Sequence, residues 1–156
     1  MNEGKVVAVC LSPSSGVPKH PQDEVKIGTF GVDGDYHAGE YRTSKGKTEV
    51  SRRHVTVVAA EALEAVSEVI GVRIPVGGVG ENILVRGLGD LGSIEPGQRL
   101  QFSSGVELEV TAQNNPCSNL QVYHPQAPKH LYGRRGLLTV VLQTGVVRPG
   151  DTVSLA

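Results

Sequence analysis

The chain has 156 residues, a size typical of one domain built around one core, so residues 1–156 are predicted to form a single domain. Its net charge of -1 argues against non-specific nucleic-acid binding, which needs a strongly basic surface. No apolar run is long enough to cross a bilayer, and no signal peptide is recognisable, so we expect a cytoplasmic protein with both cysteines reduced. Twenty glycines and nine prolines between short apolar runs favour many strands and turns over a helix bundle.

The first half of the chain alternates apolar runs with polar connections. Residues 6–11 form an uninterrupted apolar run, which is typical of a strand buried on both faces. The Ser/Pro/Gly-rich residues 12–22 predict a surface loop without chemistry, and the polar residues 41–49 predict a mobile loop. Residues 24–28 and the β-branched residues 55–58 predict two further strands.

One segment has the periodicity of a helix. Leu63, Val66 and Ile70 recur at helical spacing, while glutamates occupy the opposite face. Gly71 suits the C-terminal stop. We therefore expect a helix over residues 59–70 that covers the outside of a sheet and carries no chemistry.

The second half predicts more strands and turns. Residues 122–130 break this pattern and are predicted to be irregular. The predicted strands are residues 81–85, 99–102, 106–111, 137–142 and 151–155. About eight short strands with one clear helix predict a mainly β protein. The expected fold is a closed or nearly closed β-barrel with one or two short helices on its outside, and with functional groups in the loops at its mouth.

The segment 113–120 holds one of the two cysteines, directly after a predicted strand. Pro116 restricts the backbone there, and its Asn and Ser neighbours favour a shaped polar turn. Cys117 is thus a candidate reactive thiol, although free cysteine is also among the most buried residue types. Cys10 ends an apolar run and is expected to be an inert core residue.

A glycine-rich segment over residues 31–39 alternates acidic residues with a histidine. Asp33, Asp35 and His37 would point the same way if this segment were extended. Such a group can bind a metal or position a proton. The alternative is a turn whose carboxylates accept hydrogen bonds from neighbouring backbone amides.

Arginines stand beside two predicted strands. Arg53 precedes the strand over 55–58, and Arg134 and Arg135 lie between two glycines before the strand over 137–142. Guanidinium groups at strand ends suit phosphate or carboxylate, so these three residues are expected to converge on one anion site at the barrel mouth. The alternative is a set of solvated surface arginines.

Glycines also precede Glu81 and Asn82 at the start of a predicted strand. A dinucleotide fingerprint needs its glycines after a strand and before a helix, so this order excludes that function. Glu81 enters an apolar strand and needs a partner such as an arginine. A role in tying loops together is as consistent with this pattern as a catalytic role.

Taken in order, six segments resemble the MOSC domain, a module named for the C-terminal domain of molybdenum cofactor sulfurase. The resemblance covers nearly the whole chain. The matching segments are Gly31-Val32-Asp33-Gly34-Asp35-Tyr36-His37-Ala38-Gly39, Arg53-His54-Val55-Thr56-Val57, Gly80-Glu81-Asn82-Ile83, Pro116-Cys117, Gly133-Arg134-Arg135-Gly136 and Gly150-Asp151.

The resemblance implies that Cys117 is the functional centre, either as a molybdenum ligand within the pterin-based cofactor (molybdopterin) or as a carrier of sulfane sulfur. Both roles need a thiolate, which nearby cations favour. The cofactor carries a phosphate, and Arg53, Arg134 and Arg135 would bind it. Asp35, His37 and Asn82 would complete the cofactor-binding pocket.

Two enzymatic roles follow from the resemblance: sulfur transfer to a cofactor, and reduction of N-hydroxylated compounds. The partner would then be a cysteine desulfurase, which would bring any pyridoxal phosphate itself, or a redox protein. Two other functions stay open. One is a cofactor-delivery module without turnover, and the other is a thiol hydrolase with His37, His124 or His130 as the base.

Overall fold

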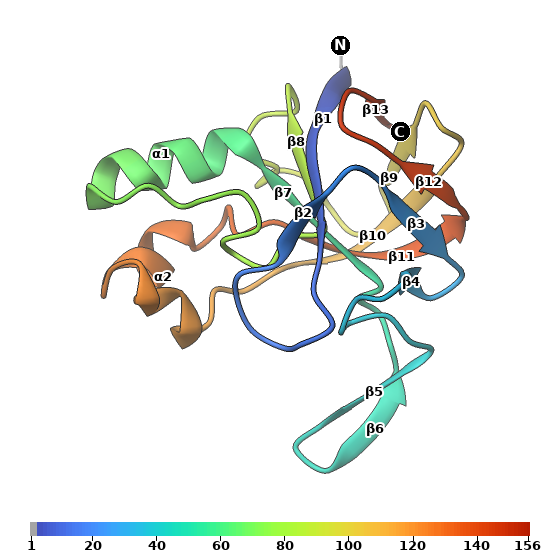
Figure 1. The fold of residues 1–156 in the computed structure, drawn as a ribbon, viewed down its shortest axis with the longest axis horizontal. Coiled ribbons are helices and arrows are strands. Elements are labelled where there is room, and N and C mark those ends of the chain that lie inside the picture. Colours follow the sequence, from blue (N-terminus) through green and yellow to red (C-terminus); the bar gives the residue numbers. More distant parts are fainter. Residues whose placement is uncertain (1–2) are drawn as a thin grey trace.

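A computed structural model describes residues 3–156, and its main feature is a β-barrel (Figure 1). Met1 and Asn2, which the predicted domain includes, lie outside the described residues. The barrel strands are β1 (Glu3–Leu11), β7 (Val55–Ala59), β8 (Ile83–Arg86), β9 (Arg99–Phe102), β10 (Glu107–Gln113), β11 (Leu137–Gln143) and β13 (Thr152–Leu155). They follow the order β13-β9-β10-β11-β7-β8-β1 around the barrel.

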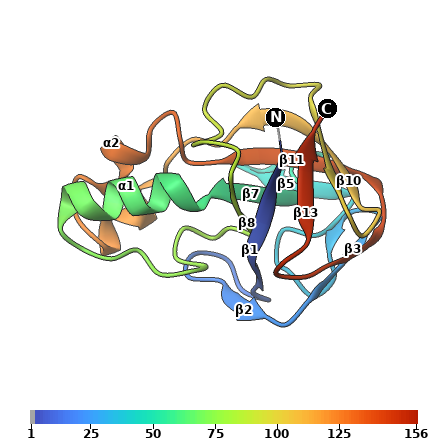
Figure 2. The same cartoon turned by 90° about the horizontal axis from the view of Figure 1, so that it is seen from above.

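Pairing between the first and last strands closes the barrel. In this antiparallel pair, Glu3 faces Ser154 and Lys5 faces Thr152, and Figure 2 shows the two strands side by side. The neighbour of β1 on its other side is β8, and the short β2 (His20–Gln22) also pairs with β1 near its end. The predicted mainly β, closed-barrel fold is therefore confirmed.

The pair β7–β8 is parallel, whereas every other pairing in the barrel is antiparallel. A parallel pair needs a crossover, and α1 (Ala60–Ile70) provides it on the outside of the barrel (Figure 1). The helix ends where the sequence predicts, because Gly71 adopts the left-handed conformation with a φ of 71°. Of the helices in residues 3–156, none has the length and hydropathy needed to cross a bilayer.

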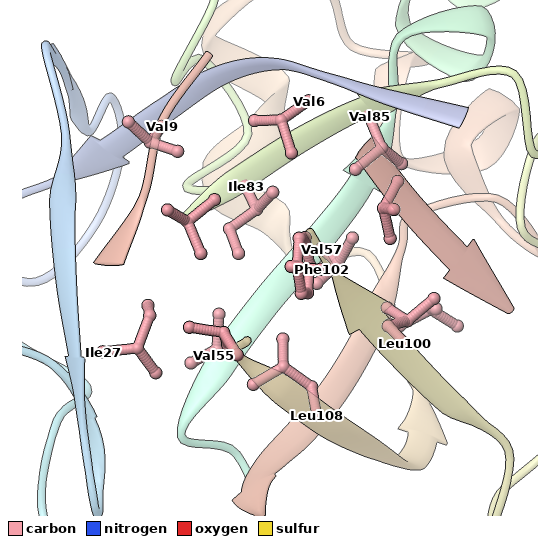
Figure 3. Close-up of a cluster of buried hydrophobic side chains, with 14 of the residues drawn as sticks. Val6, Val9, Ile27, Val55, Val57, Ile83, Val85, Leu100, Phe102 and Leu108 are labelled. Atoms are coloured by element: carbon pink, nitrogen blue, oxygen red, sulfur yellow. The ribbon is translucent and has the colours of Figure 1, made fainter. Parts of the chain in front are cut away.

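Two apolar clusters hold the structure together. The larger fills the barrel, where side chains such as Val57, Ile83 and Leu108 point toward one another (Figure 3). The smaller lies outside the barrel wall, where Val58 of β7 packs with Leu63 of α1 and with Leu131. Because alternate residues of β7 face these two clusters, the strand is apolar on both sides.

Several predicted loops are ordered elements. The predicted loop over residues 41–49 lies in an exposed hairpin of β5 (Tyr41–Ser44) and β6 (Lys47–Val50). Its turn is the dipeptide Lys45-Gly46, in which both residues have positive φ, as two-residue hairpin turns require. The predicted irregular segment contains α2 (Ala127–Leu131).

Smaller elements complete the chain. A separate sheet joins β12 (Gly145–Val147), β3 (Val25–Gly28) and β4 (Gly31–Val32), and a 3-10 helix, η1, spans Ser118–Val122.

The first strand was predicted to be buried on both faces. It differs from this prediction at Val7, which is exposed on the outer surface of the barrel.

Candidate functional site

A cavity of about 180 Å³ lies against the outer face of β7. Thr56 forms part of its wall, between Val55 and Val57, which face the barrel interior. Its lining residues come from β7 and from several loops around it and are Gly16, Val17, Lys19, His37, Arg53, Thr56, Val79, Gly80, Asn114, Cys117, Asn119 and Arg135. Of the seven candidate site residues, four line this cavity: His37, Arg53, Cys117 and Arg135.

Cys117 reaches the cavity from the loop that follows β10. The Asn114 backbone N–H donates to the Gly136 carbonyl at 2.8 Å, which ties this loop to the segment before β11. The Cys117 side chain is exposed, as a reactive thiol requires. Cys10 is 0% exposed, and its pKa is raised to about 12 by burial and by the charge of Glu81. The structure thus places one thiol at the surface and the other in the core, and the expected core position of Cys10 is confirmed.

Arg135 is the most unusual residue of the cavity. It is only 6% exposed, and its Nη2 donates to the Val79 carbonyl, yet its Nε and Nη1 have no partner. Gly136 allows this placement, because a Cβ at that position would collide with the Val57 carbonyl. Burial lowers the pKa of Arg135, and the charges of a Cys117 thiolate and of Glu81 partly offset this. Two buried, unpaired guanidinium donors beside a thiol are arranged to receive an anion.

Arg53 is the second arginine at the cavity, and its buried Nε also has no partner. Burial and the charge of Arg42 lower its pKa, whereas the attraction of a Cys117 thiolate raises it. Arg134 does not join the pair: its Nε donates to the His130 carbonyl at 2.9 Å, and its side chain is not part of the cavity wall. The predicted convergence of three arginines is therefore found for two of them.

Lys19 is a lining residue that the sequence does not indicate. Its Nζ forms an ion pair of 2.8 Å with Asp35 Oδ2. Gly77 makes room for this segment, because a Cβ there would collide with the Lys19 carbonyl, and the Lys19 N–H donates to the Gly77 carbonyl at 2.9 Å. Asp35 also accepts hydrogen bonds from the backbone N–H groups of Ser12 and His37. Asp35 thus positions a cation at the cavity and does not line it.

His37 lines the cavity from the turn after β4. Burial lowers its pKa to about 4, assisted by the charges of Lys19 and Arg53, so the imidazole is neutral at pH 7. The segment is not extended, so the three alternating residues do not point the same way: Asp33 is exposed, whereas Asp35 is buried. The segment forms a turn closed by Asp35, which is the structural alternative for this motif.

Glu81 and Asn82 shape the cavity from behind. The buried Glu81 carboxylate accepts hydrogen bonds from the Gly77 and Val79 N–H groups at 2.8 and 3.3 Å. Burial raises its pKa, and these donors and Arg135 oppose the rise. Asn82 Oδ1 accepts from the Thr56 N–H, and its Nδ2 donates to the Cys10 carbonyl. Its side chain is therefore engaged with backbone and is not a lining residue.

A second cavity of about 380 Å³ adjoins the first and shares His37 and Arg53 with it. Its other walls include Tyr36, Tyr41 and Arg42. Within residues 3–156, no group of three or more His, Cys, Asp or Glu side chains is arranged to hold a metal ion. A metal at Cys117 would therefore need to bring most of its ligands with it.

Comparison with known proteins decides the family, because the MOSC domain profile matches residues 33–154. The chain belongs to the MOSC family. A relative that also has the MOSC domain is YuaD of Bacillus subtilis (strain 168), whose name is "Putative metal-sulfur cluster biosynthesis proteins YuaD". It is 31% identical over 153 residues, which cover 85% of this chain and 80% of YuaD.

Solved structures share the MOSC fold seen here. The crystal structure of the Bacillus subtilis YUAD protein superposes with a TM-score of 0.89 at 26% identity, covering 98% of this chain and 95% of that one. YiiM from Geobacillus stearothermophilus superposes with a TM-score of 0.75 at 21% identity, over 98% of this chain and 75% of YiiM. The second likeness supports the fold alone.

Proposed function

We propose that this MOSC protein carries sulfane sulfur on Cys117 and delivers it to an anionic acceptor held by Arg135, Arg53 and Lys19. The observation that supports this most strongly is Arg135, a buried guanidinium with two unpartnered donors in the same cavity as an exposed thiol. Leaving such donors unsatisfied is costly, so their retention fits a site that an anion completes. The name of the relative YuaD is compatible with a sulfur-handling role.

The loading step is an exchange between a thiol and a persulfide. The Cys117 thiolate attacks the outer sulfur of a donor persulfide, a new S–S bond forms, and the donor's S–S bond breaks. The donor leaves as a thiolate and takes up the proton that Cys117 released, so no oxidant or reductant is needed. The charges of Arg53 and Arg135 attract the attacking thiolate.

The acceptor that this family implies is the molybdenum cofactor, and the cavity residues fit its chemistry. Arg135 Nε and Nη1 and Arg53 Nε are free to donate to its phosphate, and Lys19 adds a buried cation. When bound, the cofactor supplies a molybdenum centre that accepts sulfur ligands. The protein's residues would bind the phosphate, orient the cofactor toward Cys117 and limit the access of water.

A second candidate function is supported by the adjoining cavity. Together the two cavities have the size of ordinary cofactor sites, and Cys117 is an exposed soft ligand at their end. The protein would then hold the cofactor as its own, with Cys117 as a molybdenum ligand. Reduction of N-hydroxylated compounds, with electrons from a redox protein, would be its activity.

Mass spectrometry of the purified protein after incubation with a persulfide donor tests the first function. We expect Cys117 to gain the mass of one sulfur atom, Cys117→Ser to gain none and Cys10→Ala to load fully. Release of this sulfur to a molybdenum-cofactor acceptor completes the test. Stable co-purification of molybdenum and pterin, lost in Cys117→Ser and without sulfur loading, would replace the first function with the second.

A further inference from the structure

The β5–β6 hairpin projects away from the barrel (Figure 1). All eight residues of its two strands are exposed. A two-stranded hairpin alone is at best marginally stable, and its side chains here contribute nothing to either apolar cluster. A feature of this kind is typical of a segment that contacts another molecule.

The two faces of the hairpin differ in chemistry. Register pairs place Tyr41 beside Val50, and Thr43 Oγ1 lies 2.8 Å from Thr48 Oγ1 on the same face. Tyr41 and Val50 are 60% and 62% exposed, so an apolar patch stands open at the hairpin base. Tyrosine exposed in this way is enriched at protein interfaces.

The opposite face is basic and leads to the site. A surface hollow of about 370 Å³ is lined by Arg42, Ser44, Lys45, Lys47 and Glu49, which gives three cations to one carboxylate. Arg42, like Tyr41 of the first face, also lines the second cavity, which shares His37 and Arg53 with the cavity of Cys117. Basic side chains therefore line successive hollows between the hairpin tip and the thiol, although the net charge of the whole chain is -1.

We propose that the β5–β6 hairpin is the docking arm for an acidic surface segment of the protein that donates sulfur to Cys117. This inference rests on the sulfur-carrier function proposed above. The basic face supplies attraction and steering toward the cavity, while Tyr41 and Val50 supply the apolar contact that holds the partner. A protein partner fits this surface better than a nucleic acid, because an apolar patch adjoins the cations.

Binding of a fluorescein-labelled, Glu-rich peptide without cysteine tests the docking arm independently of sulfur chemistry. The variant Lys45→Asp/Lys47→Glu reverses two charges at the tip, and Asp tolerates the positive φ of position 45 better than most residues. We expect about tenfold weaker binding by fluorescence anisotropy at low ionic strength. The control Lys5→Glu/Lys26→Glu makes the same change in net charge as the tip variant, but at exposed residues of β1 and β3. It should bind the peptide as the parent protein does.

Sulfur-transfer kinetics provide a second test. The tip variant should load about tenfold more slowly from a persulfide on the acidic peptide, and at an unchanged rate from a small neutral persulfide. Equal peptide affinity in the tip variant and the parent protein would overturn the proposal that the hairpin is a docking arm. Tighter binding of a DNA oligonucleotide of equal charge, or of anionic vesicles, would also overturn it. Loading from neither donor would contradict the sulfur-carrier function, while the anisotropy result would still decide the docking arm.

Discussion

Lys19 Nζ and Asp35 Oδ2 form an ion pair of 2.8 Å in which the two side chains are 1% and 0% exposed. The pair joins the loop after β1 to the turn after β4, and both segments belong to the wall of the thiol cavity. Removing one member of a buried pair leaves the other charge without compensation. This pair is therefore where the stability of the fold and the geometry of the site depend most directly on each other.

The first prediction concerns this pair. Asp35→Asn should destabilise the protein by about 3–5 kcal/mol at pH 7, because Lys19 stays buried without its counter-ion. Adding Lys19→Met should recover part of this loss, since it removes the unpaired charge. Urea unfolding of the single and double variants measures both effects. A single variant as stable as the parent protein would show that the pair contributes nothing.

The pH dependence of the same pair has a definite sign. Burial raises the pKa of Asp35, but the opposing effect of Lys19 and of two backbone N–H donors is larger. The pKa of Asp35 therefore lies below its ordinary value of 3.8. Its contribution is thus complete above about pH 4 and is lost as the pH falls through the lowered pKa. The stability difference between the parent protein and Asp35→Asn should accordingly shrink only below pH 4.

The second prediction concerns the two thiols. Iodoacetamide at pH 7 should modify Cys117 in the native protein and Cys10 only after unfolding, since Cys117 is exposed and the pKa of Cys10 is raised to about 12. Peptide mapping by mass spectrometry identifies the labelled site. Cys117→Ser should unfold at the same urea concentration as the parent protein. Faster native labelling of Cys10 would show that Cys117 is not the reactive thiol.

The third prediction concerns His37. Its pKa of about 4 in the folded state lies below the ordinary 6.5, so the unfolded chain binds more protons between these values, and stability falls as the pH drops from 6.5 to 4. His37→Gln should flatten this dependence by about 1–2 kcal/mol, less than the full shift implies because the ring is partly solvent-screened. NMR titration measures the pKa directly. Pyrophosphate bound in the cavity should raise it.

The fourth prediction distinguishes the two adjacent arginines. Arg135→Met should weaken pyrophosphate binding by roughly 10- to 100-fold, the loss of about 1.5–3 kcal/mol for a charge-assisted contact. Arg134→Met removes the same charge but leaves the cavity wall intact, and its affinity should stay within about twofold of the parent value. Isothermal titration calorimetry compares the two. Equal losses would indicate a long-range charge effect in place of a direct contact.

The elements of the barrel were predictable because alternation, helical periodicity and glycine each act locally. The exposure of Cys117 was also predictable, since its loop has a polar, proline-shaped sequence after a strand. Lys19 was not, because a lysine in a Ser/Pro-rich loop is indistinguishable from a solvated one. Its burial depends on Asp35, sixteen residues later, and on the backbone of Gly77.

Arg134 and Arg135 show a second limit of local reasoning. The two residues follow the turn after α2, and only Arg135 reaches the cavity, while Arg134 donates to the His130 carbonyl. Which one does so depends on the register of β11 against β7, where Leu137 faces Val57. That register is a tertiary property, and the Gly-Arg-Arg-Gly motif alone does not contain it.

The seam between β1 and β13 pairs residues 3–5 with residues 152–154, so the barrel closes by joining the two most distant parts of the described chain. During synthesis, β1 emerges first but cannot form this seam until almost the whole chain has left the ribosome. Until then both β1 and β9 present an open strand edge, which is a template for association with other chains. A chain truncated before β13 would keep those edges permanently, and we therefore expect it to aggregate.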